Sequence, residues 1–149
     1  MKHLLYIVFF LVFSFNYSQS FYDLNIESIE GEKINFIDFK DQYVLIVNVA
    51  SRCGYTTQYE DLQKLFEKYD NLIILGVPCN QFGYQEPKSE DEIMMFCSAN
   101  YNIQFQMTKK IKVKGSSKHP LYEWLTTKEL NKLNDYKVTW NFNKFLINP

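Results

Sequence analysis

Three cysteines are the residues of this sequence best suited to chemistry, and they occupy different settings. Cys53 stands between Arg52 and Gly54, after an apolar run and just before a helix-start signal. Cys79 ends a second apolar run, and Cys97 falls on the apolar face of a predicted helix. Because the thiolate is the nucleophilic form of cysteine, the exposed joint indicates a reactive Cys53. The settings of Cys79 and Cys97 are, taken alone, typical of packing.

The elements around Cys53 explain why that position favours a thiolate. Residues 44–49 are apolar and rich in β-branched side chains, which predicts a strand buried on both faces. Thr57 and Glu60 have the form of a capping box at the start of a helix. A residue between a parallel strand and the next helix lies at the sheet edge where α/β folds gather active sites. It also faces unpaired helix N–H groups that attract an anion. A buried cysteine without a chemical role is the alternative.

The remaining elements predict an α/β domain built around a βαβ unit. The strand at 44–49, the following helix and a strand at 72–77 should place the two strands parallel and adjacent. Further signals predict a hairpin with Gly31 in its turn, a helix opened by Ser89 and Glu92, a helix beginning at Pro120, and a last strand at 138–147.

Length, charge and composition narrow the classes of function. A chain of 149 residues predicts one domain with one ordinary core. The formal charge of −1 gives no electrostatic reason to expect a nucleic-acid partner. No pair of cysteines has C-x-x-C spacing and the chain has two histidines, so we expect neither a metal site nor a cofactor.

Residues 1–20 have the order of a secretory signal peptide. A basic end at Lys2 precedes an apolar run from Leu4 to Phe13, and a polar stretch ends at Ser20. Cleavage there leaves residues 21–149 as an exported domain, periplasmic or secreted, without stable membrane insertion. An uncleaved anchor is the alternative, disfavoured because the apolar run is short for a bilayer. An odd number of cysteines in an oxidising compartment indicates a free or reactive thiol.

Polar side chains elsewhere could assist a thiolate. Gln85 lies in a loop rich in amides, and Trp140 and Asn141 stand at the start of the predicted last strand. Each is individually weak evidence for a catalytic role, because loop amides are usually exposed and a strand tryptophan usually packs in the core. Together they form a charge-neutral set of N–H donors.

At these positions the sequence resembles the glutathione peroxidase family. The resemblance rests on blocks that occur in the family's order and spacing and cover most of the chain after residue 20. They are NVASRCGYT (48–56), PCNQFGYQEP (78–87), the helix around Glu92 and Ile93, KVKG with HPLYEWL (112–125), and WNFNKFL (140–146).

The resemblance implies a thioredoxin-like α/β fold, with a central mixed sheet, an N-terminal β-hairpin and flanking helices. It implies reduction of hydrogen peroxide and organic hydroperoxides, and a part in the response to oxidative stress. By resemblance Cys53 is the peroxidatic cysteine, and Gln85, Trp140 and Asn141 occupy the other catalytic positions. Cys97 matches the resolving cysteine of members that use thioredoxin, and Cys79 matches a cysteine usually held dispensable.

The resemblance also bears on partners and on the end of the chain. It implies a Cys53–Cys97 disulfide recycled by thioredoxin or a similar dithiol, with glutathione less favoured, and a monomer or dimer. Family members continue into a further antiparallel strand and a C-terminal helix, so we expect these last two elements to be missing here. Two other functions stay open: an inactive binding module on this fold, and an exported thiol–disulfide oxidoreductase. The latter normally has C-x-x-C where this chain has Cys53 and Thr56.

Overall fold

The structure is a computed structural model that describes residues 19–149. The predicted signal peptide therefore lies outside the described residues, except for Gln19 and Ser20. None of the helices in the described part of the chain is long and apolar enough to cross a membrane.

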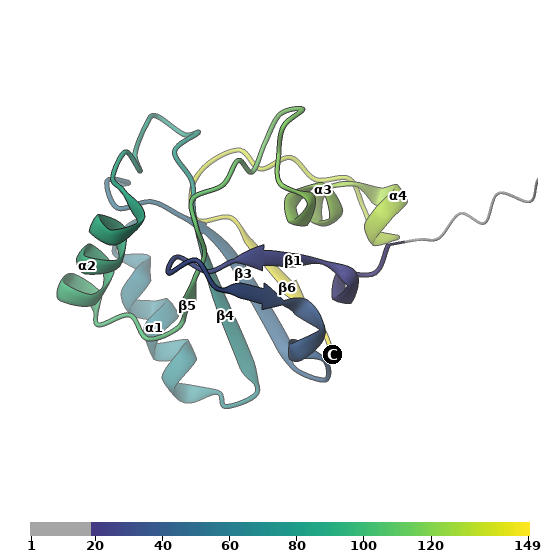
Figure 1. The fold of residues 1–149 in the computed structure, drawn as a ribbon, viewed down its shortest axis with the longest axis horizontal. Coiled ribbons are helices and arrows are strands. Elements are labelled where there is room, and N and C mark those ends of the chain that lie inside the picture. The colour runs from purple at the N-terminus through teal and green to yellow at the C-terminus, as the bar shows by residue number, and fades with distance from the viewer. Residues whose placement is uncertain (1–18) are drawn as a thin grey trace, which may run out of the picture.

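A four-stranded mixed sheet forms the centre of the described residues (Figure 1). Its strands are β3 (Tyr43–Val49), β4 (Leu72–Pro78), β5 (Gln106–Met107) and β6 (Lys144–Ile147). Across the sheet the order is β5-β4-β3-β6; β4 is parallel to β3 and β5, and β6 is antiparallel to β3. The prediction of two parallel neighbouring strands is confirmed by β3 and β4. Strand β5 was not predicted from the sequence.

Helices and a hairpin cover this sheet. They are η1 (Phe21–Asp23), β1 (Asn25–Glu27), β2 (Lys33–Asn35), η2 (Phe36–Phe39), α1 (Gln58–Lys68), α2 (Glu90–Tyr101), α3 (Pro120–Thr126) and α4 (Lys128–Asn131). Gly31 has φ +93° in the turn between β1 and β2, a conformation that costs glycine little. The predicted hairpin is confirmed, as are the capping box of Ser89 and Glu92 and the helix start at Pro120.

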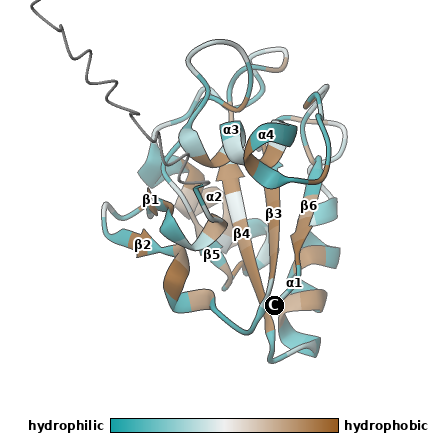
Figure 2. Ribbon diagram, turned by 90° about the vertical axis from the view of Figure 1, so that its right-hand side faces the viewer, coloured by the Kyte–Doolittle hydropathy of each residue, from teal (hydrophilic) through white to brown (hydrophobic). Residues whose placement is uncertain are grey.

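Both faces of the sheet are buried, so β3 and β4 are hydrophobic along much of their length (Figure 2). Successive side chains of a strand point to opposite faces. Val44 and Ile46 belong to one cluster of buried residues, and Val47 and Val49 belong to the other. This two-sided burial is the physical reason for the continuous apolar run at 44–49.

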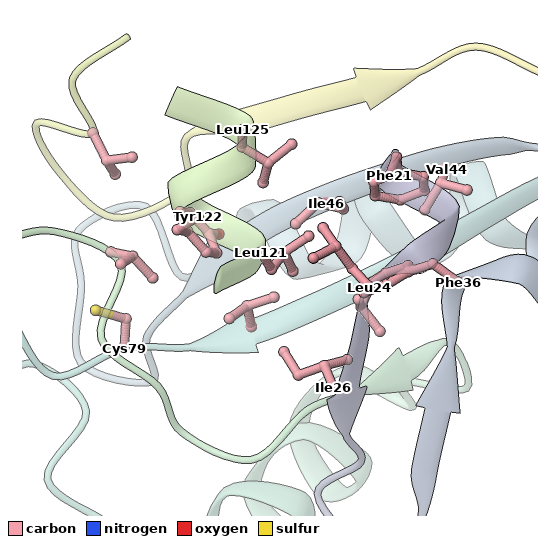
Figure 3. Close-up of a cluster of buried hydrophobic side chains, with 14 of the residues drawn as sticks. Phe21, Leu24, Ile26, Phe36, Val44, Ile46, Cys79, Leu121, Tyr122 and Leu125 are labelled. Atoms are coloured by element: carbon pink, nitrogen blue, oxygen red, sulfur yellow. The ribbon is translucent and has the colours of Figure 1, made fainter. Parts of the chain in front are cut away.

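The first cluster lies between the sheet, the N-terminal segment and α3 (Figure 3). Leu121 and Leu125 of α3 belong to it together with Phe36, which is fully buried. Cys79 belongs to this cluster at the end of β4 and is also fully buried. The thiol of Cys79 is therefore part of the core on this side of the sheet.

The second cluster lies between the other face of the sheet, α1 and α2. Leu62 of α1 and Ile93 of α2 are buried in it, and each contributes about 2 kcal/mol by leaving water. Cys53 and Cys97 both belong to this cluster. These two cysteines therefore belong to a different buried cluster from Cys79.

Two details of the predicted elements were wrong. The last strand spans only Lys144–Ile147, because residues 140–143 turn against β3 instead of extending the sheet. Thr57 does not form the predicted capping box: it has α-helical dihedral angles and makes no side-chain cap bond. Instead, successive turns wind the chain into α1, with Thr56 N–H donating to the Cys53 carbonyl and Gln58 N–H to the Tyr55 carbonyl.

Candidate active site

Cys53 lies in the turn between β3 and α1, and 9% of the residue's surface is exposed. The Tyr55 backbone N–H donates to Cys53 Sγ at 3.4 Å. The Thr56 hydroxyl oxygen accepts the Cys53 N–H at 2.9 Å and lies 2.9 Å from the Ala50 carbonyl oxygen, to which it can donate. These local bonds fix the turn and direct a backbone N–H at the sulfur.

Gln85 and Asn141 are brought together by the fold, although 56 residues separate them in the chain. Asn141 Nδ2 donates to Gln85 Oε1 at 2.9 Å. The Gln85 carbonyl accepts the backbone N–H of Arg52 at 3.1 Å, which places the Gln85 loop beside the Cys53 turn. Within residues 19–149 the Gln85 amide nitrogen has no hydrogen-bond partner, so its N–H groups are free to donate to a ligand.

Trp140 lies on the rim of this region, with 42% of its surface exposed. Its ring packs against Phe82, with 5.8 Å between the ring centroids. Its carbonyl accepts the side-chain amide of Asn48 at 2.9 Å, and Asn48 Oδ1 accepts the Asn143 N–H at 3.1 Å. Asn48 of β3 therefore fixes the turn that carries both Trp140 and Asn141.

The three predicted donors gather at the carboxyl ends of β3 and β4 but do not bond to the thiol. No hydrogen bond joins Cys53 Sγ to Gln85, Trp140 or Asn141 among the described residues. Donors in a site without substrate often tighten only when the reacting group is bound. The geometry supplies free N–H groups near the turn of Cys53, and a peroxide oxygen is a suitable acceptor for them.

Cys97 lies on α2 with 2% of its surface exposed. Burial raises the pKa of its thiol to about 11, a shift that the Tyr59 hydroxyl opposes and the Glu86 carboxyl increases. At neutral pH about one molecule in 10⁴ then holds Cys97 as a thiolate. In this conformation Cys97 is a poor nucleophile.

Cys79 is fully buried on the opposite side of the sheet. Burial raises the pKa of its thiol, against a smaller lowering by the backbone of Gln81, whose N–H lies 3.5 Å from the sulfur. The surroundings of Cys79 are those of a packed core cysteine. Among the described residues, no group of three His, Cys, Asp or Glu side chains could hold a metal ion.

Comparison with known proteins identifies the family. A family model described as "Glutathione peroxidase" matches residues 21–126, which include Cys53, Gln85 and Cys97. The chain belongs to the glutathione peroxidase family. A curated relative, "Glutathione peroxidase-like peroxiredoxin 2" of Saccharomyces cerevisiae, is 46% identical over 130 residues, which cover 86% of this chain and 80% of the relative. "Glutathione peroxidase homolog BsaA" of Staphylococcus epidermidis is 45% identical over 131 residues, covering 87% and 82%.

A solved structure of the same family confirms the fold. The crystal structure of T. cruzi GPX1 is 32% identical, with a TM-score of 0.65 over 87% of this chain and 79% of that one. The thioredoxin-like fold predicted from the sequence is therefore confirmed. The protein is a glutathione peroxidase-like peroxidase, which takes a peroxide as substrate and a thiol as reductant.

Two positioning side chains of this peroxidase were missed by reasoning from the sequence. Asn48 carried a usable signal, because it is a polar residue inside an apolar strand and is fully buried. Thr56 carried a weaker signal for such a role, because Ser and Thr hydroxyls often bond the nearby backbone in turns. Their roles became visible only when the partners of their side chains were known.

Proposed function

We propose that this peroxidase reduces hydrogen peroxide and organic hydroperoxides through Cys53 and closes its cycle through a Cys53–Cys97 disulfide. One observation carries the pairing: Cys53 and Cys97 belong to the same cluster on one face of the sheet, and Cys79 lies on the other. A disulfide needs Cα atoms within about 7 Å of each other, so a partner behind the sheet is disfavoured.

The first chemical step is attack of the Cys53 thiolate on a peroxide oxygen. The O–O bond breaks, Cys53 becomes a sulfenic acid, and the other oxygen leaves as hydroxide or alkoxide and takes up a proton. Gln85, Trp140 and Asn141 donate N–H groups to the charge that develops on the leaving oxygen. Loss of one such donor typically slows a reaction about 10²- to 10³-fold.

The second step is attack of Cys97 on the Cys53 sulfenic acid, which forms the disulfide and releases water. Cys97 is 2% exposed and its pKa is raised to about 11, so the folded α2 holds it in an unreactive state. We propose that α2 unwinds locally for this step, which exposes the thiol and returns its pKa toward the ordinary value of about 8.5.

The third step is reduction of the disulfide by an external dithiol, which leaves with a disulfide of its own. Thioredoxin or a similar protein dithiol suits a protein disulfide better than glutathione does. The name of the yeast relative, a peroxiredoxin, supports this choice. Turnover of this kind removes peroxides during oxidative stress.

We further propose that residues 1–20 are a signal peptide and that the domain of residues 21–149 acts in a periplasm or outside the cell, as a monomer or dimer. The support is the order of a basic end, an apolar run and a polar stretch. Sequencing the N-terminus of the exported protein tests this: a mature chain beginning at Phe21 agrees with it, and an intact Met1 overturns it.

Hydrogen peroxide consumption by the purified protein with a thioredoxin system tests the proposed cycle. Cys53→Ser removes the nucleophile and Cys97→Ser removes the resolving thiol, so we expect both variants to lose turnover. Cys79→Ser is the matched control, and we expect it to retain turnover because the thiol lies behind the sheet. Turnover that survives in Cys97→Ser and disappears in Cys79→Ser would contradict the proposed pairing.

A further inference from the structure

Glu86 is a fully buried acid that the chemistry described above does not use. It follows Gln85, and both of its carboxylate oxygens are engaged by Ser51. The Ser51 N–H donates to Oε2 at 2.7 Å, and the Ser51 hydroxyl donates to Oε1 at 2.7 Å. The Glu86 N–H donates to Asn80 Oδ1 at 2.9 Å. Hydrogen bonds therefore fix both the side chain and the backbone of Glu86.

These bonds join the two segments that carry the proposed catalytic groups. Ser51 and Arg52 are the two residues directly before Cys53. Ser51 is bonded to Glu86, and Arg52 N–H is bonded to the carbonyl of Gln85 at 3.1 Å. Two consecutive residues of the Cys53 loop are thus bonded to two consecutive residues of the Gln85 loop. The distance between the Cys53 sulfur and the Gln85 amide depends on this double connection.

Connecting the two loops through a buried carboxylate costs folding free energy. Burial raises the pKa of Glu86, while the two Ser51 hydrogen bonds and, more weakly, the charges of Lys110 and Lys88 lower it. The ion pairs found within residues 19–149 do not include Glu86. Burying a charge without a paired cation costs stability, and a neutral side chain of similar volume is cheaper for the fold. What the carboxylate provides is two rigid, strong acceptors facing one residue.

We propose that Glu86 is a positioning residue for the peroxide step: through Ser51 it holds the Cys53 turn at the correct distance from the Gln85 and Asn141 amides. The inference rests on the proposed role of Cys53 as the peroxidatic residue. Glu86 touches neither the peroxide nor the sulfur, and it acts through the loop that it fixes. Misplacing a reacting group by about 1 Å can slow a reaction about 10²-fold.

The test compares two reactions of the Cys53 sulfur in the full-length protein. One is single-turnover oxidation by hydrogen peroxide, which needs the amide donors. The other is alkylation by iodoacetamide, followed by mass spectrometry of the Cys53 peptide, which does not need them. In Glu86→Gln we expect oxidation to slow about 10²-fold and alkylation to change less than about threefold. Glu60→Gln is the control, because it makes the same chemical change on the exposed side of α1, and it should alter neither rate.

A second variant keeps the test decisive if Glu86→Gln does not fold. Ser51→Ala removes only the bond from the hydroxyl and leaves the one from the backbone N–H. We expect it to slow oxidation about 10-fold, again without slowing alkylation. Unchanged oxidation in both folded variants, or an equal loss of oxidation and alkylation, would overturn the proposal. Failure of the proposed function would look different, because wild type and Cys53→Ser would then react with peroxide at the same rate.

Discussion

The sulfur atoms of Cys53 and Cys97 have different surroundings, which suit them to different steps. Cys53 Sγ lies in a turn and accepts a backbone N–H from Tyr55. Cys97 lies inside a helix, where burial raises its pKa to about 11. The second sulfur is held in an unreactive state by the folded helix and must be exposed before it can react.

At this scale the sequence indicated which residues lie together in the fold better than it indicated their contacts. Cys53, Gln85 and Asn141 are brought to one edge of the sheet as expected, because strand ends and their following loops meet there. Glu86 and Asn48 were not predicted as positioning residues. A buried polar side chain is recognised by its partners, and those of Asn48 are more than 90 residues away in the chain.

Trp140 gives a residue-scale prediction. Its ring packs on Phe82, and its indole N–H has no hydrogen-bond partner within residues 19–149. Trp140→Phe keeps an aromatic ring on Phe82 and removes only the donor. We expect the rate of Cys53 oxidation by hydrogen peroxide to fall about 10²-fold, with the midpoint of thermal unfolding nearly unchanged. An oxidation rate equal to that of wild type would show that the indole donates nothing to the leaving oxygen.

At the scale of elements, α2 is a core helix that carries Cys97, the proposed resolving cysteine. Its first turn is fixed by the capping box of Ser89 and Glu92, and its last turn ends at Asn102 in the left-handed region. Ile93 and Cys97 are its buried residues. The apolar anchoring of this helix is therefore small, which favours local unwinding at modest cost.

Ser89 provides the corresponding prediction. Ser89→Ala removes the cap and costs the helix about 1 kcal/mol, which raises the population of the unwound helix about fivefold. We expect disulfide formation after oxidation of Cys53 to accelerate by up to that factor, measured by quenched-flow trapping of free thiols. Ser98→Ala is the control, since it makes the same change at an exposed position inside α2. An unchanged or slower rate of disulfide formation in Ser89→Ala would mean that α2 reacts without unwinding.

The sequence predicted β3, β4, the hairpin and the main helices because their periodicity reflects burial on a face. It failed where polar contacts decide the conformation. The turn after β3 is set by Thr56, and the short β6 is set by the bonds that Asn48 makes to residues 140–143. Such contacts leave no periodic signal in the sequence.

At the scale of the whole molecule, the described residues form two buried clusters, one on each face of the sheet, and the three cysteines are divided between them. Cys53 and Cys97 share the cluster formed with α1 and α2. Cys79 lies in the cluster formed with the N-terminal hairpin and α3. Cys53 follows the end of β3 and Cys79 follows the end of β4, and their thiols belong to different clusters. Unwinding of α2 opens the cluster that holds Cys53 and Cys97 and leaves Cys79 in the other one.

The most direct test of this account is a peptide map of the protein after reaction with one equivalent of hydrogen peroxide, digested without reduction. We predict a single intramolecular disulfide between Cys53 and Cys97, with Cys79 recovered as a free thiol. A Cys53–Cys79 disulfide would contradict the account. So would Cys53 accumulating as sulfinic acid while Cys97 stays reduced.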